Sequence, residues 1–387
     1  MKYKDSNLAL NLLSKVRHID TKRIIFLILC LLIYYSSIAQ DKKIFFDLTS
    51  GGGRLYPNAY ESHLAGPVTF FNARIGLKTL GQKEWQRLYN YPLMGIGISH
   101  NYLTTKSLGN PMAVYSFLLL PLLGRSELKL NLGINLGVAW GYNPHRAQYP
   151  YDTVIGSLVA FYASMNFNTS FHIAKSLELL FAFEFYHLSN GNTNKPNYGI
   201  NMLGAETGLR YTLTNSKTVA IRDPVLPAEK NSSFIVFGSW GWKKEWVGVS
   251  ESNVGSISAG YYRTINNKSR LSIGADLFYN EATLYETHKE NVLSNVLAAG
   301  LFTGHELTIS KLSIVTQFGV YVFNPYPSDP FYYTRIGLRY AIGKRVIASL
   351  TMKAHGLAVD FLEWGFGYAF WKSGPRKTKK YIAMKPS

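Results

Sequence analysis

Residues 128–142 have the sequence LKLNLGINLGVAWGY. A large apolar side chain occupies every second position, and lysine, asparagine, glycine or alanine lies between. Because side chains on a β-strand alternate between two faces, one face is apolar and the other is polar or small. A soluble β-sandwich shows the same alternation. This run, however, exceeds the roughly 5–6 residues of soluble strands and reaches the roughly 9–11 that cross a membrane. It predicts a strand of a transmembrane β-barrel.

The composition of the chain also favours an outer-membrane β-barrel. Only 17% of the 387 residues are charged, whereas tyrosine (27), phenylalanine (22) and glycine (33) are abundant. The mean hydropathy of −0.03 excludes a helical membrane protein. After residue 40 no segment of useful length shows the apolar period of a helix. Such a composition is typical of an exported barrel rather than of a cytosolic enzyme.

About sixteen alternating runs follow one another along the chain. They begin near Lys43, Thr69, Leu93, Met112, Glu127, Ile155, Lys175 and Ile200, and then near Ser233, Gly255, Ser269, Asn295, Thr308, Phe331, Arg345 and Asp360. Bacterial barrels have even numbers of strands, so two architectures fit. One is a single antiparallel barrel of about sixteen strands with a longer turn in the middle. The other is a pair of eight-stranded barrels. We favour the single barrel, because two barrels side by side need a longer linker.

An export signal precedes the strands. The pair Lys22-Arg23 is basic, residues 24–33 form an apolar run too short to span a bilayer comfortably, and Ser37-Ile38-Ala39 resembles a cleavage site. We therefore expect Gln40 to be the mature N-terminus, with an uncleaved anchor as the alternative. Cys30 is the only cysteine and lies inside the signal, so the mature chain holds no disulfide and no thiolate metal site.

This pattern divides the chain into five segments. They are a signal peptide (1–39), a first barrel half (40–213), a connecting segment (214–232) that contains Asp223, Pro224 and Pro227, a second barrel half (233–371) and a basic tail (372–387). The formal charge is +18, of which +14 remains after the signal is removed. Nucleic acid is one partner for such charge, but in an exported barrel we favour anionic lipid headgroups over nucleic acid.

A candidate active site lies at the end of the run that begins at Lys175. Its odd positions share one face, which carries an apolar row and then a histidine and a serine: Leu177, Leu179, Phe181, Phe183, Phe185, His187 and Ser189. Positions i and i+2 of a strand are roughly 6.6 Å apart, within reach of a histidine nitrogen and a serine hydroxyl. A serine becomes a nucleophile when a base takes its proton. The pattern predicts Ser189 as nucleophile, His187 as base and the phenylalanines as a wall for an acyl chain.

The next strand supplies a group that can orient the imidazole, as such sites require. Its outward positions are predicted to include Asn201, whereas Glu206 and Arg210 point into the lumen. With the hairpin centred near Lys195, Asn201 would lie opposite Ser189 and diagonal to His187. Glu206 is excluded unless a β-bulge reverses the alternation. The alternative is that these polar residues merely mark the headgroup edge of the membrane, where they are ordinary.

The motif around this site resembles a known family. His187-Leu188-Ser189-Asn190-Gly191, followed by Lys195-Pro196-Asn197-Tyr198-Gly199-Ile200-Asn201, is similar to the signature of the outer-membrane lipid A 3-O-deacylase (PagL-type) family. The resemblance covers about residues 180–213. It implies a barrel with a serine–histidine–acid site on its lipid-facing wall, which removes an ester-linked acyl chain from lipid A. The family's acid, usually glutamate, falls on Asn201, which can orient an imidazole but cannot offset its charge.

The same motif is also similar to outer-membrane phospholipase A, whose triad is histidine, serine and asparagine. Both resemblances imply that the Asn190 side chain and the Gly191 N–H stabilise the oxyanion. The leading hypothesis is a serine esterase of the Gram-negative outer membrane that deacylates lipid A without a metal or other cofactor. The alternatives are a phospholipase, which would imply calcium and dimers, and a non-catalytic porin or structural barrel. The sequence leaves the oligomeric state open.

The second half repeats part of this pattern without the serine. His355 is followed by Leu357 where the first half has Ser189, and it shares a face with Ser349, Thr351 and Lys353. We expect His355 to belong to a lumenal polar network with Glu363. The second half therefore has no predicted catalytic role.

Overall fold

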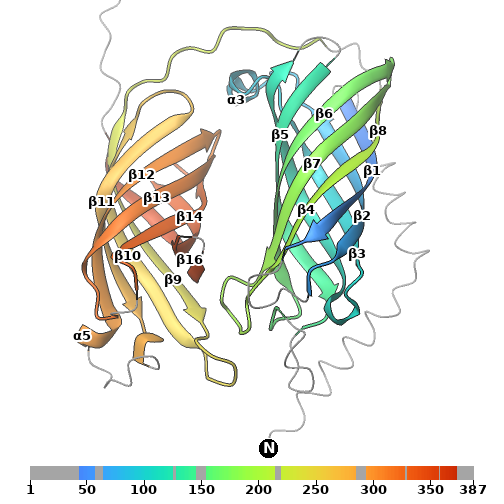
Figure 1. Cartoon of the computed structure of the whole chain (residues 1–387). Helices are drawn as coiled ribbons and strands as arrows, with labels where there is room; N and C mark the ends of the chain where they lie inside the picture. Colours follow the sequence, from blue (N-terminus) through green and yellow to red (C-terminus); the bar gives the residue numbers. More distant parts are fainter. Residues whose placement is uncertain are drawn as a thin grey trace, which may run out of the picture.

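The computed structural model describes residues 43–56, 64–124, 128–144, 154–213, 219–284, 293–326, 329–356 and 358–372. Within them the chain forms two closed antiparallel barrels of eight strands each (Figure 1). The prediction of a single sixteen-stranded barrel is wrong, and the alternative of two eight-stranded barrels is confirmed. The predicted signal peptide and all but the first residue of the basic tail lie outside the described residues.

The strands agree with the predicted runs to within a few residues. The first barrel contains β1 (Lys43–Leu55), β2 (Pro67–Lys78), β3 (Leu93–Leu103), β4 (Gly109–Gly124), β5 (Leu128–Tyr142), β6 (Ala160–Ala174), β7 (Leu177–Ser189) and β8 (Ile200–Thr212). The second contains β9 (Ser232–Lys243), β10 (Ser252–Thr264), β11 (Ser269–Asn280), β12 (Leu297–Ile309), β13 (Leu312–Phe323), β14 (Tyr332–Ala341), β15 (Val346–His355) and β16 (Ala358–Lys372). Three short helical segments, α3 (Glu84–Leu88), η3 (Lys106–Leu108) and α5 (Leu293–Val296), lie in the connections. No helix of the described ranges is long and apolar enough to span a membrane.

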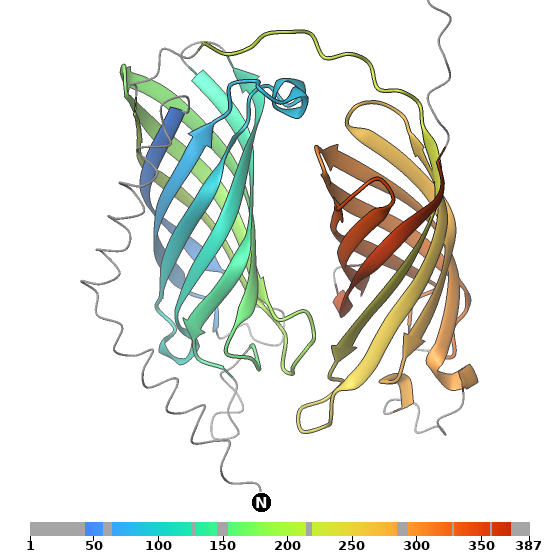
Figure 2. The same cartoon turned by 180° about the vertical axis from the view of Figure 1, so that it is seen from behind.

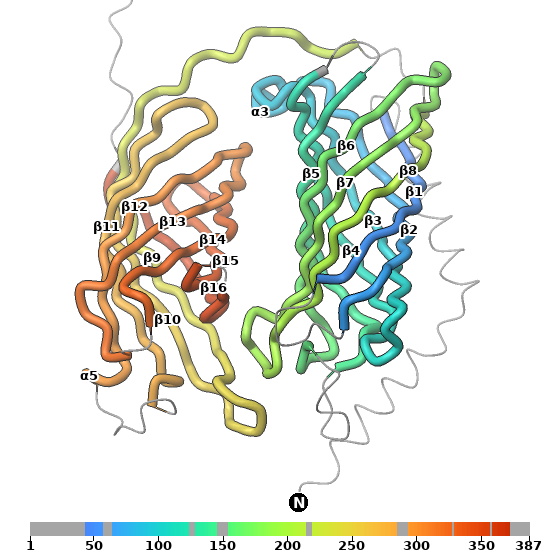
Figure 3. Tube along the Cα trace, in the orientation of Figure 1, coloured from blue at the N-terminus to red at the C-terminus, as the bar shows by residue number. Residues whose placement is uncertain are grey.

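Closure of each barrel follows from the pairing of its first and last strands. In the first barrel β8 pairs with β1, for example Leu209 with Leu48, so the sheet closes before the connecting segment begins. In the second barrel β16 pairs with β9, with Trp364 opposite Trp240. Closure leaves neither sheet with an open edge, which is the condition for a sheet in a hydrocarbon layer. Residues 219–231 of the connecting segment then run toward the second barrel, as the tube in Figure 3 shows.

The alternation that predicts the strands also sets their faces. On β5, Leu136, Val138 and Trp140 point outward and are 38–44% exposed. Asn131 and Asn135 on the same strand point inward and are at most 2% exposed. An apolar exterior and a polar interior are the arrangement that a membrane barrel requires.

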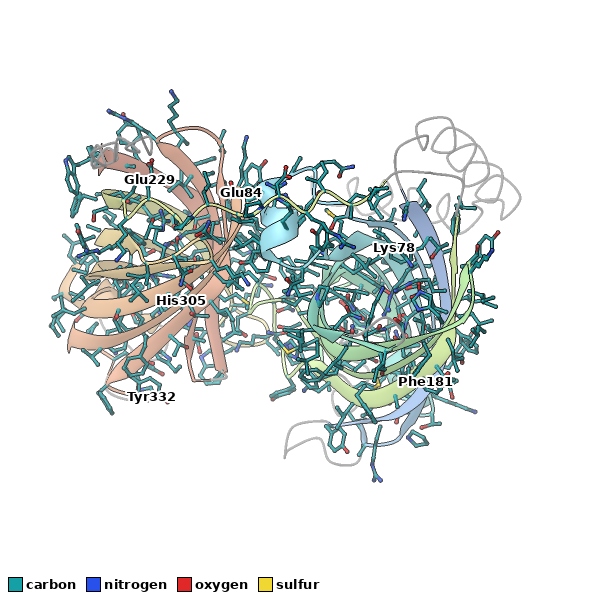
Figure 4. The ribbon with its side chains drawn as sticks, turned by 90° about the horizontal axis from the view of Figure 1, so that it is seen from above. Lys78, Glu84, Phe181, Glu229, His305 and Tyr332 are labelled. Carbon is teal, nitrogen blue, oxygen red and sulfur yellow. The ribbon has the colours of Figure 1, made fainter. Side chains whose placement is uncertain are left out.

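Polar side chains fill the interior of the first barrel. Arg210 donates two hydrogen bonds to Asp47, at 2.7 and 2.8 Å. Glu206 accepts from Thr49 at 2.6 Å and from Asn72 at 2.7 Å. Figure 4, seen from above, shows side chains crowded inside both barrels. An eight-stranded barrel is just wide enough for its side chains to fill it, so this lumen is a packed core.

The second barrel has its own buried network. Arg335 donates to Glu363 at 2.8 Å and to Asp276 at 3.0 Å, so the lumenal position predicted for Glu363 is confirmed. We expected His355 to belong to a polar network with Glu363, but these two side chains are not hydrogen-bonded to each other. The Nε2 atom of His355 lies 2.9 Å from the hydroxyl oxygen of Tyr321. Glu363 is opposite Thr351, and His355 lies four residues further along β15, so the two side chains are separated along the strand.

The two barrels are in contact at two places, one at each end of the first barrel. Figure 2 shows the two barrels side by side. Near the connecting segment, the hydroxyl of Tyr89 donates to the backbone oxygen of Thr308 at 2.8 Å. Tyr89, Leu120 and Ile309 form a buried apolar cluster there. At the opposite end, the turn between β7 and β8 meets the second barrel through Asn192. This second contact lies beside the candidate site.

Candidate active site

The hairpin of β7 and β8 brings His187 and Asn201 directly opposite each other. The Nδ1 atom of His187 lies 2.6 Å from Oδ1 of Asn201. We expected Asn201 opposite Ser189. The hairpin is instead centred one residue earlier, on Asn194, which moves the register by two positions and leaves every side chain on its predicted face. Asn201 therefore bonds the imidazole directly rather than across a diagonal.

The predicted faces of this hairpin are confirmed. Phe181, Phe183 and Phe185 point outward with 44%, 71% and 46% of their surfaces exposed. Figure 4 shows Phe181 at the outer wall of the first barrel. Glu206 and Arg210 point inward, with exposed fractions of 4% and 1%. The ladder between the two strands runs without a bulge, so Glu206 is on the face away from His187.

Ser189 is the last residue of β7, and its side chain is enclosed by the following turn. The residue is only 8% exposed. Its hydroxyl donates to Oδ1 of Asn197 at 3.3 Å and accepts from Nδ2 of the same side chain at 3.1 Å. The backbone N–H of Gly191 also donates to the Ser189 oxygen, at 3.1 Å. In this structure the hydroxyl is thus bonded to Asn197 rather than to His187.

The side chain of Asn190 holds the turn together. Its Nδ2 donates to the backbone oxygen of Asn194 at 2.9 Å, and its backbone N–H donates to Oδ1 of Asn197, also at 2.9 Å. Asn190 is 2% exposed. Two residues are predicted to stabilise an oxyanion. The N–H of Gly191 points at the oxygen of Ser189, whereas the side-chain amide of Asn190 is hydrogen-bonded within the turn.

Two glycines fit the turn closely around the site. Gly191 has φ +66°, in the left-handed region that favours glycine. Gly199 has φ +76°, and a Cβ atom there would lie 2.7 Å from Cε1 of His187. A side chain at Gly199 would therefore collide with the imidazole. The motif contains glycine at this position because the backbone passes against His187.

Asn197 is the site residue that the sequence argument does not assign. It lies in the turn, where side chains do not alternate between two faces, so the strand pattern gives no information about its direction. The signal available for it is its place inside the motif, eight positions after Ser189. Its backbone also forms an isolated β-bridge with Ile155, which fixes this part of the turn against the β5–β6 connection.

The described residues contain no group of three or more histidine, cysteine, aspartate or glutamate side chains that would hold a metal ion. The Ser189 hydroxyl meets the amide of Asn197 and the backbone N–H of Gly191, and the imidazole of His187, two residues earlier on β7, meets the amide of Asn201. A serine hydrolase needs groups of these kinds, namely a nucleophile, a base, a group that orients the base, and hydrogen-bond donors beside the nucleophile.

Comparison with known families gives two matches. Residues 69–210 match the model of the lipid A 3-O-deacylase (PagL) family. Residues 231–373 match the C-terminal domain of acyloxyacyl hydrolase. The first match contains the serine, histidine and asparagine of the site, and the second covers the barrel whose role the sequence leaves open. Comparison with curated proteins gives no match.

Two solved structures are each similar to part of the chain. The crystal structure of Neisserial surface protein A has a TM-score of 0.33 and 8% identity over 44% of this chain and 97% of its own. The crystal structure of the outer-membrane enzyme PagL has a TM-score of 0.30 and 15% identity over 43% of this chain and 99% of its own.

Each family match covers one of the two closed eight-stranded barrels, and both families are carboxylic ester hydrolases. The first barrel is thus similar to the lipid A 3-O-deacylase (PagL) family, and the second to the C-terminal domain of acyloxyacyl hydrolase.

Proposed function

We propose that the chain is an outer-membrane serine esterase that removes an ester-linked acyl chain from lipid A. The observation that carries this proposal is the His187–Asn201 pair, with 2.6 Å between Nδ1 and Oδ1, on the outward face beside Ser189. Polar groups on a lipid-facing wall are costly, and a hydrogen-bonded imidazole next to a serine suits acyl transfer. The family match to lipid A 3-O-deacylase supports lipid A as the substrate.

Asn201 determines which nitrogen of the imidazole acts as the base. Its amide oxygen accepts a hydrogen bond, so it favours the tautomer with the proton on Nδ1 of His187. The Nε2 atom is then free to take the proton of a serine hydroxyl. For this step the hydroxyl of Ser189 turns from Asn197 toward Nε2 when the substrate binds. Hydrogen bonds of catalytic groups often form fully only in the substrate complex.

The reaction then follows the course of a serine esterase. An acyl chain lies along the wall of Phe181, Phe183 and Phe185, and the ester carbonyl reaches Ser189. The Ser189 oxygen attacks the carbonyl carbon while His187 takes its proton. The tetrahedral intermediate expels the sugar oxygen, which receives that proton, and leaves an acyl-enzyme. Water, activated by His187 in the same way, attacks the acyl-enzyme and releases the fatty acid.

Two donors beside Ser189 suit the oxyanion of the intermediate. They are the Gly191 N–H and the Nδ2 group of Asn197, each 3.1 Å from the serine oxygen. Donors already in place stabilise the charge that develops in the transition state at little reorganisation cost. The Asn190 side chain, in this scheme, supports the turn that carries both donors. No metal or other cofactor takes part in these steps.

The position of the site along the barrel suits the outer leaflet. The site lies at the end of the first barrel opposite the connecting segment (Figure 1). If the short connections face the periplasm, as they do in bacterial barrels, this end faces outward. Lipid A resides in that leaflet.

The test is mass spectrometry of lipid A and phospholipids from cells that produce the full chain. We expect wild type to yield lipid A that lacks one ester-linked acyl chain, and Ser189→Ala and His187→Ala to abolish this change. The chain offers a matched control: Nε2 of His305 lies 3.1 Å from the hydroxyl oxygen of Ser269 on the second barrel. Ser269→Ala and His305→Ala should leave the activity intact.

Unchanged lipid A in cells that contain folded wild-type protein would overturn the proposal. Changed phospholipids with unchanged lipid A would replace it with a phospholipase, and sensitivity of that activity to a chelator would then be expected. Equal loss in Ser269→Ala and Ser189→Ala would show that the first barrel does not carry the chemistry alone.

A further inference from the structure

The turn that carries the oxyanion donors is bonded to the second barrel through Asn192. The Nδ2 group of Asn192 donates to the backbone oxygen of Val359 at 2.7 Å and to that of Asp360 at 3.1 Å. Both acceptors lie at the start of β16. Asn192 is 9% exposed and has φ +67°, a left-handed conformation that asparagine tolerates better than most residues. Its side chain therefore uses both amide hydrogens on the other barrel.

A different segment of the second barrel bonds the backbone of the same residue. The N–H of Lys244, which follows β9, donates to the backbone oxygen of Asn192 at 3.0 Å. Leu362 of β16 packs beside the neighbouring Gly191, where an added Cβ atom would lie 3.4 Å from Cβ of Leu362. Asn192 is thus held on two sides, by β16 and by the turn between β9 and β10.

The part of β16 that receives Asn192 is itself fixed by charge. The carboxylate of Asp360 pairs with Lys243 at 2.8 Å and with Lys353 at 2.6 Å. The three side chains are 8%, 6% and 4% exposed. Salt bridges shielded from water in this way are screened little by salt. The acceptors of the Asn192 amide therefore belong to a rigid part of the second barrel rather than to a free loop.

We propose that Asn192 is a positioning residue for catalysis, and that the second barrel completes the active site by holding the turn after Ser189. The inference rests on the proposed function. Asn192 directly follows Gly191, whose N–H lies 3.1 Å from the oxygen of Ser189. If the second barrel releases Asn192, the Gly191 N–H leaves the place where the oxyanion forms. This gives the second barrel a role that does not need a second serine.

The test compares two substitutions in the full chain, purified in detergent. Asn192→Gly accepts the left-handed backbone and removes the amide. Asn192→Asp keeps the size of the side chain but cannot donate to the two carbonyl oxygens. A misplaced donor of the oxyanion lowers the rate by about 10- to 100-fold, because displacements near 1 Å have effects of this order. We expect both variants to lose kcat by that factor with KM unchanged, since Asn192 does not line the phenylalanine wall.

Tyr89→Phe is the matched control at the other end of the barrels, where it removes the hydrogen bond to Thr308. We expect it to keep wild-type kcat. Activity is measured on lipid A and on a soluble acyl ester, with folding checked by heat-modifiable gel mobility. Wild-type kcat in either Asn192 variant would overturn the inference, and so would an equal loss in Tyr89→Phe. A wild type active on the soluble ester alone would overturn the lipid A proposal while the Asn192 comparison still stands. A wild type inactive on both would overturn both.

Discussion

Replacing Asn201 by aspartate should raise the activity of this enzyme. The amide oxygen of Asn201 lies 2.6 Å from Nδ1 of His187, and a carboxylate oxygen takes the same place without a change of side-chain length. When His187 accepts the proton of Ser189, an imidazolium forms. An amide orients that cation but leaves its charge without a counter-ion, whereas a carboxylate stabilises it. The stabilisation acts mainly in the transition state, so it appears in kcat.

The size of the effect follows from Coulomb's law. Two unit charges about 4 Å apart interact with about 4 kcal/mol at an effective dielectric constant of 20. Asn201 and His187 are partly exposed, so water screens their interaction. We therefore take about a third of the Coulomb energy as the stabilisation of the transition state. About 1.4 kcal/mol corresponds to a tenfold rise in kcat. Asn201→Glu places its carboxylate one methylene further out and is expected to keep some activity.

The assay is the initial rate of fatty-acid release from lipid A in detergent micelles, measured for wild type, Asn201→Asp, Asn201→Glu and Asn201→Ala. Asn201→Ala leaves the imidazole without its partner and should lower kcat by about 10- to 100-fold, less than the roughly 10⁴-fold loss seen when an orienting group that is a carboxylate is replaced. Wild-type activity in Asn201→Ala would refute the orienting role. Complete loss in Asn201→Glu with an intact fold would also tell against it.

Three further predictions follow from single contacts. Gly199→Ala should lower kcat by about 100-fold while the barrel stays folded, because the new Cβ would lie 2.7 Å from Cε1 of His187. A wild-type rate would contradict the close approach of the Gly199 backbone to the imidazole. Asp47→Asn should lower the stability of the first barrel by about 3 kcal/mol, measured by urea unfolding in micelles, because it leaves the buried Arg210 without the partner that it bonds at 2.7 and 2.8 Å. An unchanged midpoint would show that Glu178, 3.6 Å away, compensates fully. Addition of a chelator should leave lipid A deacylation unchanged, and a loss restored by calcium would instead support a phospholipase-type site.

The strands and their faces could be predicted from the sequence because both depend on a local period of two residues. The alternation of β5 and β7 fixes which side chains point outward whatever the partner strands are. It therefore placed His187 and Asn201 on one face and Glu206 on the other. A register error of two residues did not matter for that conclusion, because an even shift preserves the face of every side chain.

Closure and the turn could not be predicted in the same way. Whether β8 pairs with β1 or with β9 depends on hydrogen bonds between distant strands, and Leu209 has the same outward position in either sheet. We favoured one barrel because the connecting segment is short. That reasoning holds only if two barrels must lie far apart. In the structure they touch at Tyr89 and Asn192, so residues 213–231 suffice. Asn197 was not assigned because its direction depends on the path of the turn.

A polar site on the outer wall of a membrane barrel has to keep its polar groups away from hydrocarbon when no substrate is bound. The first barrel supplies part of this burial with its own turn, and the second barrel supplies the rest. Ser189 and Asn190 are 8% and 2% exposed because the turn folds over them, and Asn192 is 9% exposed because β16 covers it. Unpaired polar groups in lipid cost several kcal/mol each, so covering and bonding them lowers the cost of placing a hydrolase site there. The second barrel thus adds cover and hydrogen bonds at Asn192 to a turn that the first barrel closes around Ser189.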